Sequence, residues 1–368
     1  MPEDTLVLSE LVIPGTYIRV QADALIGVGG ISVGNIGIVG TAELMPDADE
    51  QADFGTFLLS DYNGARSLLG TYDAFAAGAG ERNLVRSIEL LYRNGARTVF
   101  ARALAPDDGD DLDAYTAAFT ELIKDNVNIL VAPELSTDNA KAVLAPILAT
   151  AENEGKDLIA VIGSDSAAPA NIAGQAPADD RIIFTAPGIR VYDSAAKDAV
   201  DLPGTYAAAA VAGLLSSLAP QSSPTNKVLP GVVKLTRRFS YGETVSLVQG
   251  RVLVLEERQG VRIVRGITSD DAAFRQITTR RITDFAKAGI RQASNPFIGR
   301  LNNQRVRKAL HGAINGFLTT MVQDEALIGY SLDVTATRAD EIANRAIVTA
   351  ILQPTFSIDY IAVTLVLQ

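Results

Sequence analysis

Cysteine, tryptophan and histidine are almost missing from the 368-residue chain, which has no cysteine, no tryptophan and one histidine, His311. Without cysteine the chain forms no disulfide bond, no thiolate metal site and no cysteine nucleophile. A single histidine leaves little scope for an imidazole metal site or a histidine general base. These absences exclude the side-chain sets on which most enzymes rely.

Long apolar runs are also missing, although 48% of the residues are hydrophobic. No stretch reaches the roughly 18 uninterrupted apolar residues that a membrane-spanning helix needs. The start, MPEDTLVLSE, is acidic where a secretory signal would be basic. We therefore expect a soluble, non-exported protein that is made in the cytoplasm and does not insert into a membrane.

Positive charge is scarce overall but concentrated in one region. The formal net charge is −11, which argues against nucleic acid as a direct partner. Residues 230–330 nevertheless hold 16 Lys and Arg against 8 Asp and Glu, or +8, and the rest of the chain has 16 against 35, or −19. This basic region is either a solvated surface or a docking face for an acidic partner.

Helical and strand-like segments alternate over residues 22–225. In RNLVRSIELLYRNGARTVFARAL, apolar residues at helical spacing lead through Gly95 into a short apolar strand. The same order recurs before NILVAP and DLIAVIG, and a further strand, RIIFTAPGIRVYD, precedes the Ala-rich helix GTYAAAAVAGLLSSLA. Short strands that are apolar on both faces are typical of a parallel sheet covered on both sides. We predict an α/β layer domain over 22–225.

A different pattern follows the Pro- and Ser-rich stretch PQSSPTNKVLPG. GRVLVLEERQGVRIVRG predicts a hairpin with RQG at its turn, and GYSLDV and RAIVTAIL predict two later strands. Between them we predict two amphipathic helices, one through Phe274, Ile277, Ile282 and Phe285, the other through Val306, Leu310, Ile314, Phe317 and Met321. We expect a smaller α+β domain over 226–355.

Both ends of the sequence are predicted to be extended arms, over 1–21 and 356–368. The first, TLVLSELVIPGTYIRV, is strand-like and broken by Pro14-Gly15. The second is apolar on both faces from Tyr360 onward, as in a strand inside a sheet. The partner of this strand is either the sheet of its own domain or something outside it.

The sequence contains no motif whose context and spacing match a catalytic, nucleotide-binding or calcium-binding site. Gly30–Gly34 matches G-x-S-x-G with Ser32 in the nucleophile position, but the surrounding sequence predicts loop and strand, where the motif requires a turn into a helix. No dinucleotide or P-loop glycine pattern occurs. The acidic run Asp107–Asp113 lacks the glycine and final glutamate of an EF-hand loop. We expect no catalytic residue, no cofactor and no metal site.

Several segments, in this order, resemble contractile tail sheath proteins, which occur in phages with contractile tails and in related bacterial injection devices. They are PGTY at 14–17, VGNIGIVGTAE with the acidic loop after it, ELLYRNGARTVFARAL, PGTYAAAAVAGL, VRIVRGITSDDAAFRQITTRRITDF, NPFIGRLNNQRVRKAL and QPTFSIDYIAVTLVL. Together they extend over nearly the whole chain, and their order gives the resemblance its specificity.

The resemblance implies a subtilisin-like α/β domain without protease activity and a C-terminal α+β domain that assembles the sheath. In this family the terminal arms add strands to the C-terminal-domain sheets of neighbouring subunits and so join rings into a helical sleeve. The partner of the last strand would then be another copy of the chain. The strand-exchange residues implied are Leu6, Val7, Leu8, Val12, Tyr17, Ile358, Tyr360, Ile361, Val363, Leu365 and Leu367.

The family's sleeve surrounds an inner tube and shortens when triggered at the baseplate, without ATP, which drives the tube through a target cell envelope. The implied partners are further copies of the chain, an inner tail tube protein, and baseplate and tail terminator proteins. The implied location is the tail sheath of a virion or of an injection device. On the helix that contains RLNNQRVRKAL the apolar stripe should turn basic residues outward, so we expect these to face the tube: Arg300, Arg305, Arg307, Lys308 and His311.

Two other interpretations stay open on the residues alone, a small-molecule enzyme on a doubly wound α/β sheet and a ligand-binding or scaffold module. A sheath protein should form rings or tubes when purified. An enzyme should instead form small oligomers and bind a ligand saturably.

Overall fold

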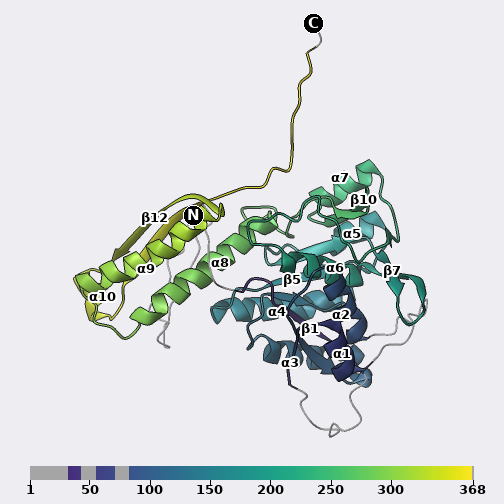
Figure 1. The fold of residues 1–368 in the computed structure, drawn as a ribbon, viewed down its shortest axis with the longest axis horizontal. Helices are drawn as coiled ribbons and strands as arrows, with labels where there is room; N and C mark the ends of the chain where they lie inside the picture. The colour runs from purple at the N-terminus through teal and green to yellow at the C-terminus, as the bar shows by residue number, and fades with distance from the viewer. Residues whose placement is uncertain (1–31, 43–54, 71–82, 367–368) are drawn as a thin grey trace. The chain divides into compact units, whose positions relative to one another are not determined.

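The computed structural model describes residues 32–42, 55–70 and 83–366 (Figure 1). Contacts divide the described chain into two compact units. The first, here the α/β unit, comprises Ser32–Glu154, Leu158–Thr278 and the end of the chain from Ser357. The second, here the C-terminal unit, comprises Gly155–Asp157 and Thr279–Phe356.

An eight-stranded sheet, in the order β11-β10-β6-β5-β4-β1-β3-β2, forms the centre of the α/β unit. The six strands from β10 to β3 run parallel, and β11 and β2 add antiparallel edges. This confirms the predicted parallel sheet. The strands are β1 (Ile36–Thr41), β2 (Phe57–Leu59), β3 (Val99–Leu104), β4 (Ile129–Val131), β5 (Ile159–Gly163), β6 (Ile182–Ala186), β10 (Leu253–Glu257) and β11 (Val261–Ile263).

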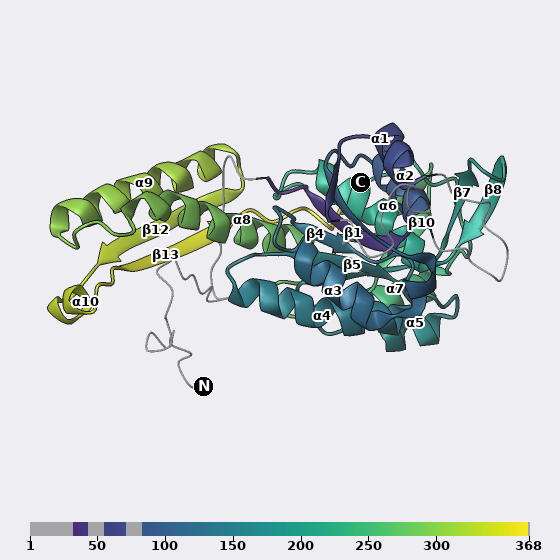
Figure 2. The same cartoon turned by 90° about the horizontal axis from the view of Figure 1, so that it is seen from below.

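Helices cover both faces of this sheet, as Figure 2 shows. Along β5, Ile159 and Val161 point into the core that α1, α2 and α6 share, while Ala160 and Ile162 point into the core of α3, α4, α5 and α7. Strand residues alternate between two dry layers, so the strands are apolar throughout. The helices are α1 (Tyr62–Leu69), α2 (Leu84–Arg93), α3 (Leu112–Leu122), α4 (Thr137–Asn153), α5 (Pro169–Gln175), α6 (Gly204–Ser217) and α7 (Tyr241–Gln249).

The segment predicted as a single strand, RIIFTAPGIRVYD, is two strands in the structure. Pro187 and Gly188 separate β6 from β7 (Ile189–Asp193). Proline has no N–H to give to a ladder, so the chain leaves the large sheet here. β7 then pairs with β8 (Asp198–Leu202) and β9 (Lys234–Leu235) in a three-stranded sheet.

The predicted hairpin is present as β10 and β11, which pair antiparallel with Gln259 and Gly260 at positive φ in the turn. The sequence pattern placed this hairpin in the second domain. In the structure its first strand extends the α/β sheet, because β10 pairs with β6 in parallel. The Pro- and Ser-rich stretch before it therefore marks a loop within the α/β unit.

The C-terminal unit packs two long helices against a two-stranded hairpin. α8 (Ile277–Ser294) begins after Phe274, which the sequence pattern had included in this helix. β12 (Leu327–Thr335) and β13 (Ile347–Pro354) pair antiparallel, and both were predicted. The remaining elements are the 3₁₀ turn η3 (Asn295–Phe297), α9 (Gln304–Gln323) and α10 (Arg338–Ile342).

One face of the hairpin and one stripe of α9 form the core of this unit, and Figure 1 shows α9 lying along β12. The buried stripe of α9 is Leu310, Ile314, Leu318 and Met321, of which Leu318 was not predicted. Phe317 is partly buried at its margin. Across the ladder, Tyr330 faces Leu352, and Leu332 faces Ala350.

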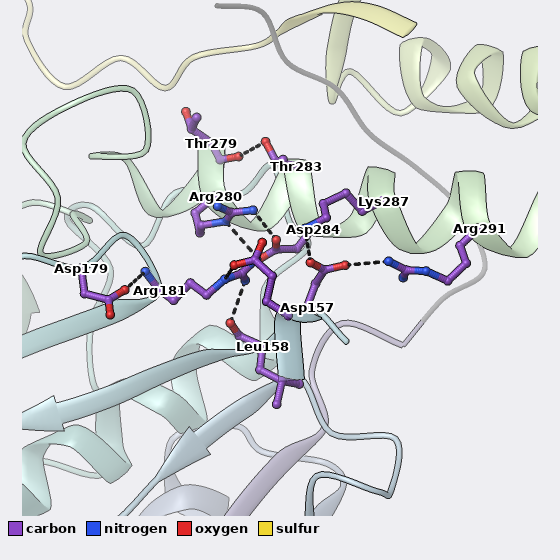
Figure 3. A network of polar contacts seen from close by, with 11 residues as sticks. Asp157, Leu158, Asp179, Arg181, Thr279, Arg280, Thr283, Asp284, Lys287 and Arg291 are labelled. Atoms are coloured by element: carbon purple, nitrogen blue, oxygen red, sulfur yellow. Dashed lines mark hydrogen bonds and ion pairs between the residues drawn. The ribbon is translucent and has the colours of Figure 1, made fainter. Parts of the chain in front are cut away.

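A buried carboxylate in the C-terminal unit is paired with two basic side chains. Asp157 forms ion pairs with Lys287 at 2.5 Å and Arg291 at 3.5 Å, both on α8 (Figure 3). The side chains of Asp157 and Lys287 are almost fully buried. Charges removed from water in this way contribute to stability only while they stay paired.

Candidate assembly site

The last described segment, 355–366, contains no strand and runs as an extended thread (Figure 1). Thr355 donates a backbone hydrogen bond to Ala326 at 3.1 Å. Beyond it the large apolar side chains are exposed, Ile361 to 82% and Leu365 to 85%. The others are Phe356, Ile358, Tyr360, Val363 and Val366. A stretch this apolar is expected to be covered in an assembly.

One side chain of this segment points inward. Asp359 Oδ2 accepts from Arg265 Nε at 2.9 Å, and Asp359 Oδ1 accepts from the Thr225 hydroxyl at 3.4 Å. Within 358–366 Asp359 is the one residue that is not exposed. The alternation of side chains along this segment predicts only that residue 359 is one more position of a strand. The one feature of the sequence that could have predicted this inward contact is that Asp359 is the only charged residue among the apolar residues of the segment.

The hairpin of the C-terminal unit offers strand edges. β12 and β13 pair with each other, and in the described residues neither has a second strand beside it. Each therefore presents a row of backbone N–H and C=O groups along its outer side. Ile328, Ile347 and Ile351 are exposed on these two strands. Such an edge suits the addition of an extended segment.

Ion pairs inside each unit neutralise much of the positive charge of the basic region, residues 230–330. In the α/β unit Arg237 pairs with Glu243 at 3.0 Å and Arg258 with Glu256 at 3.1 Å. In the C-terminal unit further pairs join Arg280 to Asp284, Lys287 and Arg291 to Asp157, and Arg307 to Glu341. The excess charge of this region is thus only partly free to attract a partner.

The five basic residues expected to face a tube differ in their surroundings. Arg300 lies before α9, not on it, with its guanidinium 5.2 Å from the centre of the Phe297 ring. Arg305 and Lys308 are exposed on α9, and His311 is half-buried there. Arg307 Nη1 donates to Glu341 Oε1 at 3.0 Å and to Asn302 Oδ1 at 2.9 Å, so its charge is compensated within the unit.

The residues that resembled chemical motifs have structural roles. Ser32 Oγ donates to Asn35 Oδ1 at 2.8 Å and stands before β1, whereas a nucleophile elbow follows a strand. In the acidic run, Asp111 caps α3 by accepting from Asp113 N and Ala114 N. Across 32–42, 55–70 and 83–366, no cluster of acidic residues and histidine is arranged to hold a metal ion. In the same ranges no helix is long and apolar enough to span a membrane.

Some of the predicted strand-exchange residues lie outside the described ranges. These are the positions of the first arm and the end of the last one: Leu6, Val7, Leu8, Val12, Tyr17 and Leu367.

Two family models match adjacent parts of the sequence and together cover more than half of it. The phage tail sheath protein central domain matches residues 109–269, and the phage tail sheath C-terminal domain matches residues 269–368. No curated protein matches the sequence.

Several solved structures share the fold. The contracted helical sheath of the anti-feeding prophage has a TM-score of 0.74 at 20% identity, covering 97% of this chain and 99% of that one. The contracted sheath of the extracellular contractile injection system PVC has a TM-score of 0.72 at 18% identity, covering 97% of this chain and 98% of that one. A sheath tail protein from Desulfitobacterium hafniense has a TM-score of 0.63 at 13% identity, covering 93% of this chain and 100% of that one.

Proposed function

The chain belongs to the contractile tail sheath family, and we propose that its copies polymerise into a helical sleeve around an inner tube by exchanging terminal strands. The observation that carries this proposal is the exposed apolar segment 356–366, for which the described part of its own chain provides no strand partner. A subtilisin-like arrangement of the α/β unit, without its catalytic triad, belongs to the same proposal.

Strand addition would give the hairpin edges a hydrogen-bonding partner and the last arm an apolar surface to pack against. The edges of β12 and β13 carry backbone groups without a strand partner in the described chain, and the last arm carries apolar side chains in water. Docking an arm from one copy onto a hairpin edge of another would satisfy the backbone groups and bury the side chains. Each fully buried Ile, Leu or Val side chain contributes roughly 1.5 to 3 kcal/mol.

The proposed partner inside the sleeve is an acidic tube. Arg300, Arg305 and Lys308 are exposed in the C-terminal unit and lie outside its ion pairs. Exposed ion pairs are weak, each contributing about 0 to 1 kcal/mol, so such a contact holds only when many copies repeat it. A contact of this kind also releases readily when the sleeve shortens. Baseplate and terminator proteins complete the proposed set of partners.

Removing Ser357–Gln368 tests the exchange. We expect a truncated protein that keeps its circular dichroism spectrum and melting temperature but forms no tubes in negative-stain micrographs, because the cores end before this segment. Tubes as abundant as those of the full chain would contradict the proposal.

A point variant sharpens the same test. Val363→Asp places a charge on a side chain that is exposed in the single chain and buried in the proposed assembly, so it should reduce tube yield at least tenfold. Val363→Thr, which nearly keeps the shape, is the matched control and should retain most of the yield. Equal yields from the two variants would show that Val363 stays in water.

A further inference from the structure

A partly buried ion pair holds the beginning of the C-terminal arm. Asp359 has a side chain only 8% exposed, and its partner Arg265 is 20% exposed. Its neighbours in sequence, Ile358 and Tyr360, are exposed to 80% and 77%. The arm therefore turns one carboxylate inward while the apolar side chains on either side of it stay in water.

The surface that receives Asp359 is built by two loops of the α/β unit. Thr225 Oγ1 accepts hydrogen bonds from Gly266 N and Ser223 Oγ, both at 3.0 Å, so its remaining proton is directed to Asp359. Gly266 makes this contact possible, because a Cβ there would lie 2.6 Å from Pro224 Cγ. The Thr225 hydroxyl is thus positioned by the fold and does not depend on the arm.

Arg265 also contacts the next residue of the arm. Its guanidinium carbon lies 5.4 Å from the centre of the Tyr360 ring, within the range of a cation–π interaction. The same arginine therefore holds two consecutive residues, one through its carboxylate and the other through its ring. Lysine would not reproduce this geometry, because it lacks the planar group.

We propose that Arg265, with Thr225, is a positioning residue that clamps Asp359 and Tyr360 and so fixes where the exchanged strand leaves its own subunit. This inference rests on the proposed strand exchange. The clamp divides the arm into an anchored root, up to Tyr360, and a free strand that begins at Ile361. Its ligand is a segment of this same chain, recognised by a carboxylate followed directly by an aromatic ring.

Tether length gives the clamp its effect. The chain makes its last backbone hydrogen bond of the C-terminal unit at Thr355. The eleven residues from Phe356 to Val366 could span roughly 36 Å, whereas the six from Ile361 to Val366 span roughly 20 Å. A shorter free segment explores a smaller volume, which raises its effective concentration at an acceptor within reach and excludes acceptors that are further away.

Nitroxide mobility in the unassembled protein tests the clamp independently of assembly. The chain has no cysteine, so a label can be placed at Ile361→Cys alone or at Val366→Cys alone. We expect Asp359→Asn to shorten the rotational correlation time at position 361 by at least about twofold, with little change at 366. Charge-assisted hydrogen bonds are the strong ones, so the amide should hold the arm much less well. Identical spectra at 361 with and without the substitution would overturn the clamp.

Charge reversal adds a rescue. Arg265→Asp should mobilise position 361 as Asp359→Asn does, and combining Arg265→Asp with Asp359→Arg should restore most of the immobilisation. An unchanged melting temperature in Asp359→Asn would show that the effect is confined to the arm. A double variant as mobile as either single variant would count against a direct pair.

Tube formation then separates the clamp from the strand exchange on which it rests. With wild-type tubes present, we expect Asp359→Asn to slow tube growth roughly tenfold, the factor that follows from losing one charge-assisted hydrogen bond. Unchanged growth would overturn the clamp and leave the strand exchange intact. Absence of wild-type tubes would overturn the proposed function, whereas the mobility result would still report on the clamp.

Discussion

Asp157 shows how much a single residue can matter in a protein with few special side chains. Its carboxylate is 2.5 Å from Lys287 Nζ, and both side chains are buried (Figure 3). Asp157→Ala would remove the carboxylate that compensates the buried positive charge of Lys287. We expect the free energy of unfolding to fall by about 3 to 5 kcal/mol, measured by urea denaturation of the unassembled protein.

The matched control for this prediction is an exposed pair. Glu121 on α3 and Lys124, just after the helix ends, form an ion pair at 2.5 Å, with side chains 43% and 63% exposed. Glu121→Ala should change the free energy of unfolding by less than about 1 kcal/mol. Similar losses for the two variants would show that burial does not govern the strength of these pairs.

Asp340 should make the free energy of unfolding depend on pH in the acidic range. Hydrogen bonds from the Thr337 hydroxyl and backbone N–H, together with Arg345, lower the pKa of Asp340 to about 2. Because this pKa lies below that of the unfolded chain, near 3.9, the charged carboxylate stabilises the fold above about pH 4. That contribution is lost as the pH falls from about 4 through 2.

Two measurements check the role of Asp340. The difference in unfolding free energy between wild type and Asp340→Asn should shrink between pH 5 and pH 2. An NMR titration should show that Thr337→Ala raises the pKa of Asp340 toward its usual range, because the largest cause of the shift is the Thr337 hydroxyl. A constant difference across this pH range would contradict the prediction.

Among the elements, α8 and α9 are held together by a close contact that requires glycine. A Cβ on Gly289 of α8 would lie 1.5 Å from Cζ of Phe317 on α9. Gly289→Ala therefore forces the ring or a helix to move, and we expect a loss of about 1 to 3 kcal/mol in the free energy of unfolding.

Gly312 provides the opposite case on the same pair of helices. It lies inside α9, and no atom would come within 4 Å of a Cβ placed on it. Alanine is the better helix former, so Gly312→Ala should stabilise the protein by about 1 kcal/mol. Thermal unfolding of both variants should move the melting temperature in opposite directions, and a shift of the same sign would refute the packing argument.

At the scale of the assembled molecule, the exposed charges of α9 should set the hold on the tube. Arg305 and Lys308 are exposed, so Arg305→Glu with Lys308→Glu should give sheaths that form without retaining a tube. The hold of wild-type sheath should weaken with salt, since screening acts over about 8 to 10 Å at ordinary ionic strength. Co-sedimentation of sheath with tube at two salt concentrations measures both effects.

Arg307 is the matched control, because Glu341 already compensates its charge. Arg307→Gln should lower the stability of the C-terminal unit and leave tube retention unchanged. Retention of the tube by the Arg305 and Lys308 double variant at physiological salt would show that α9 does not face it. The assignment of the chain to the sheath family would be unaffected by that result.

The sequence by itself determined the local pattern of this protein and its family. Alternating apolar helices and strands predicted the parallel sheet, the spacing of Leu310, Ile314 and Met321 predicted the buried face of α9, and the order of motifs indicated a sheath protein. These features are local, because each depends on residues a few positions apart.

Only the tertiary structure decided which distant residues meet. It placed β10 beside β6, which moved the predicted hairpin into the α/β unit, and it brought Glu341 to Arg307, which removes that arginine from the free charges. It also brought Arg265 to Asp359. The spacing of apolar residues does not predict such pairs. An ion pair or a strand neighbour depends on which distant segments the fold brings together, and no local pattern in the sequence specifies that.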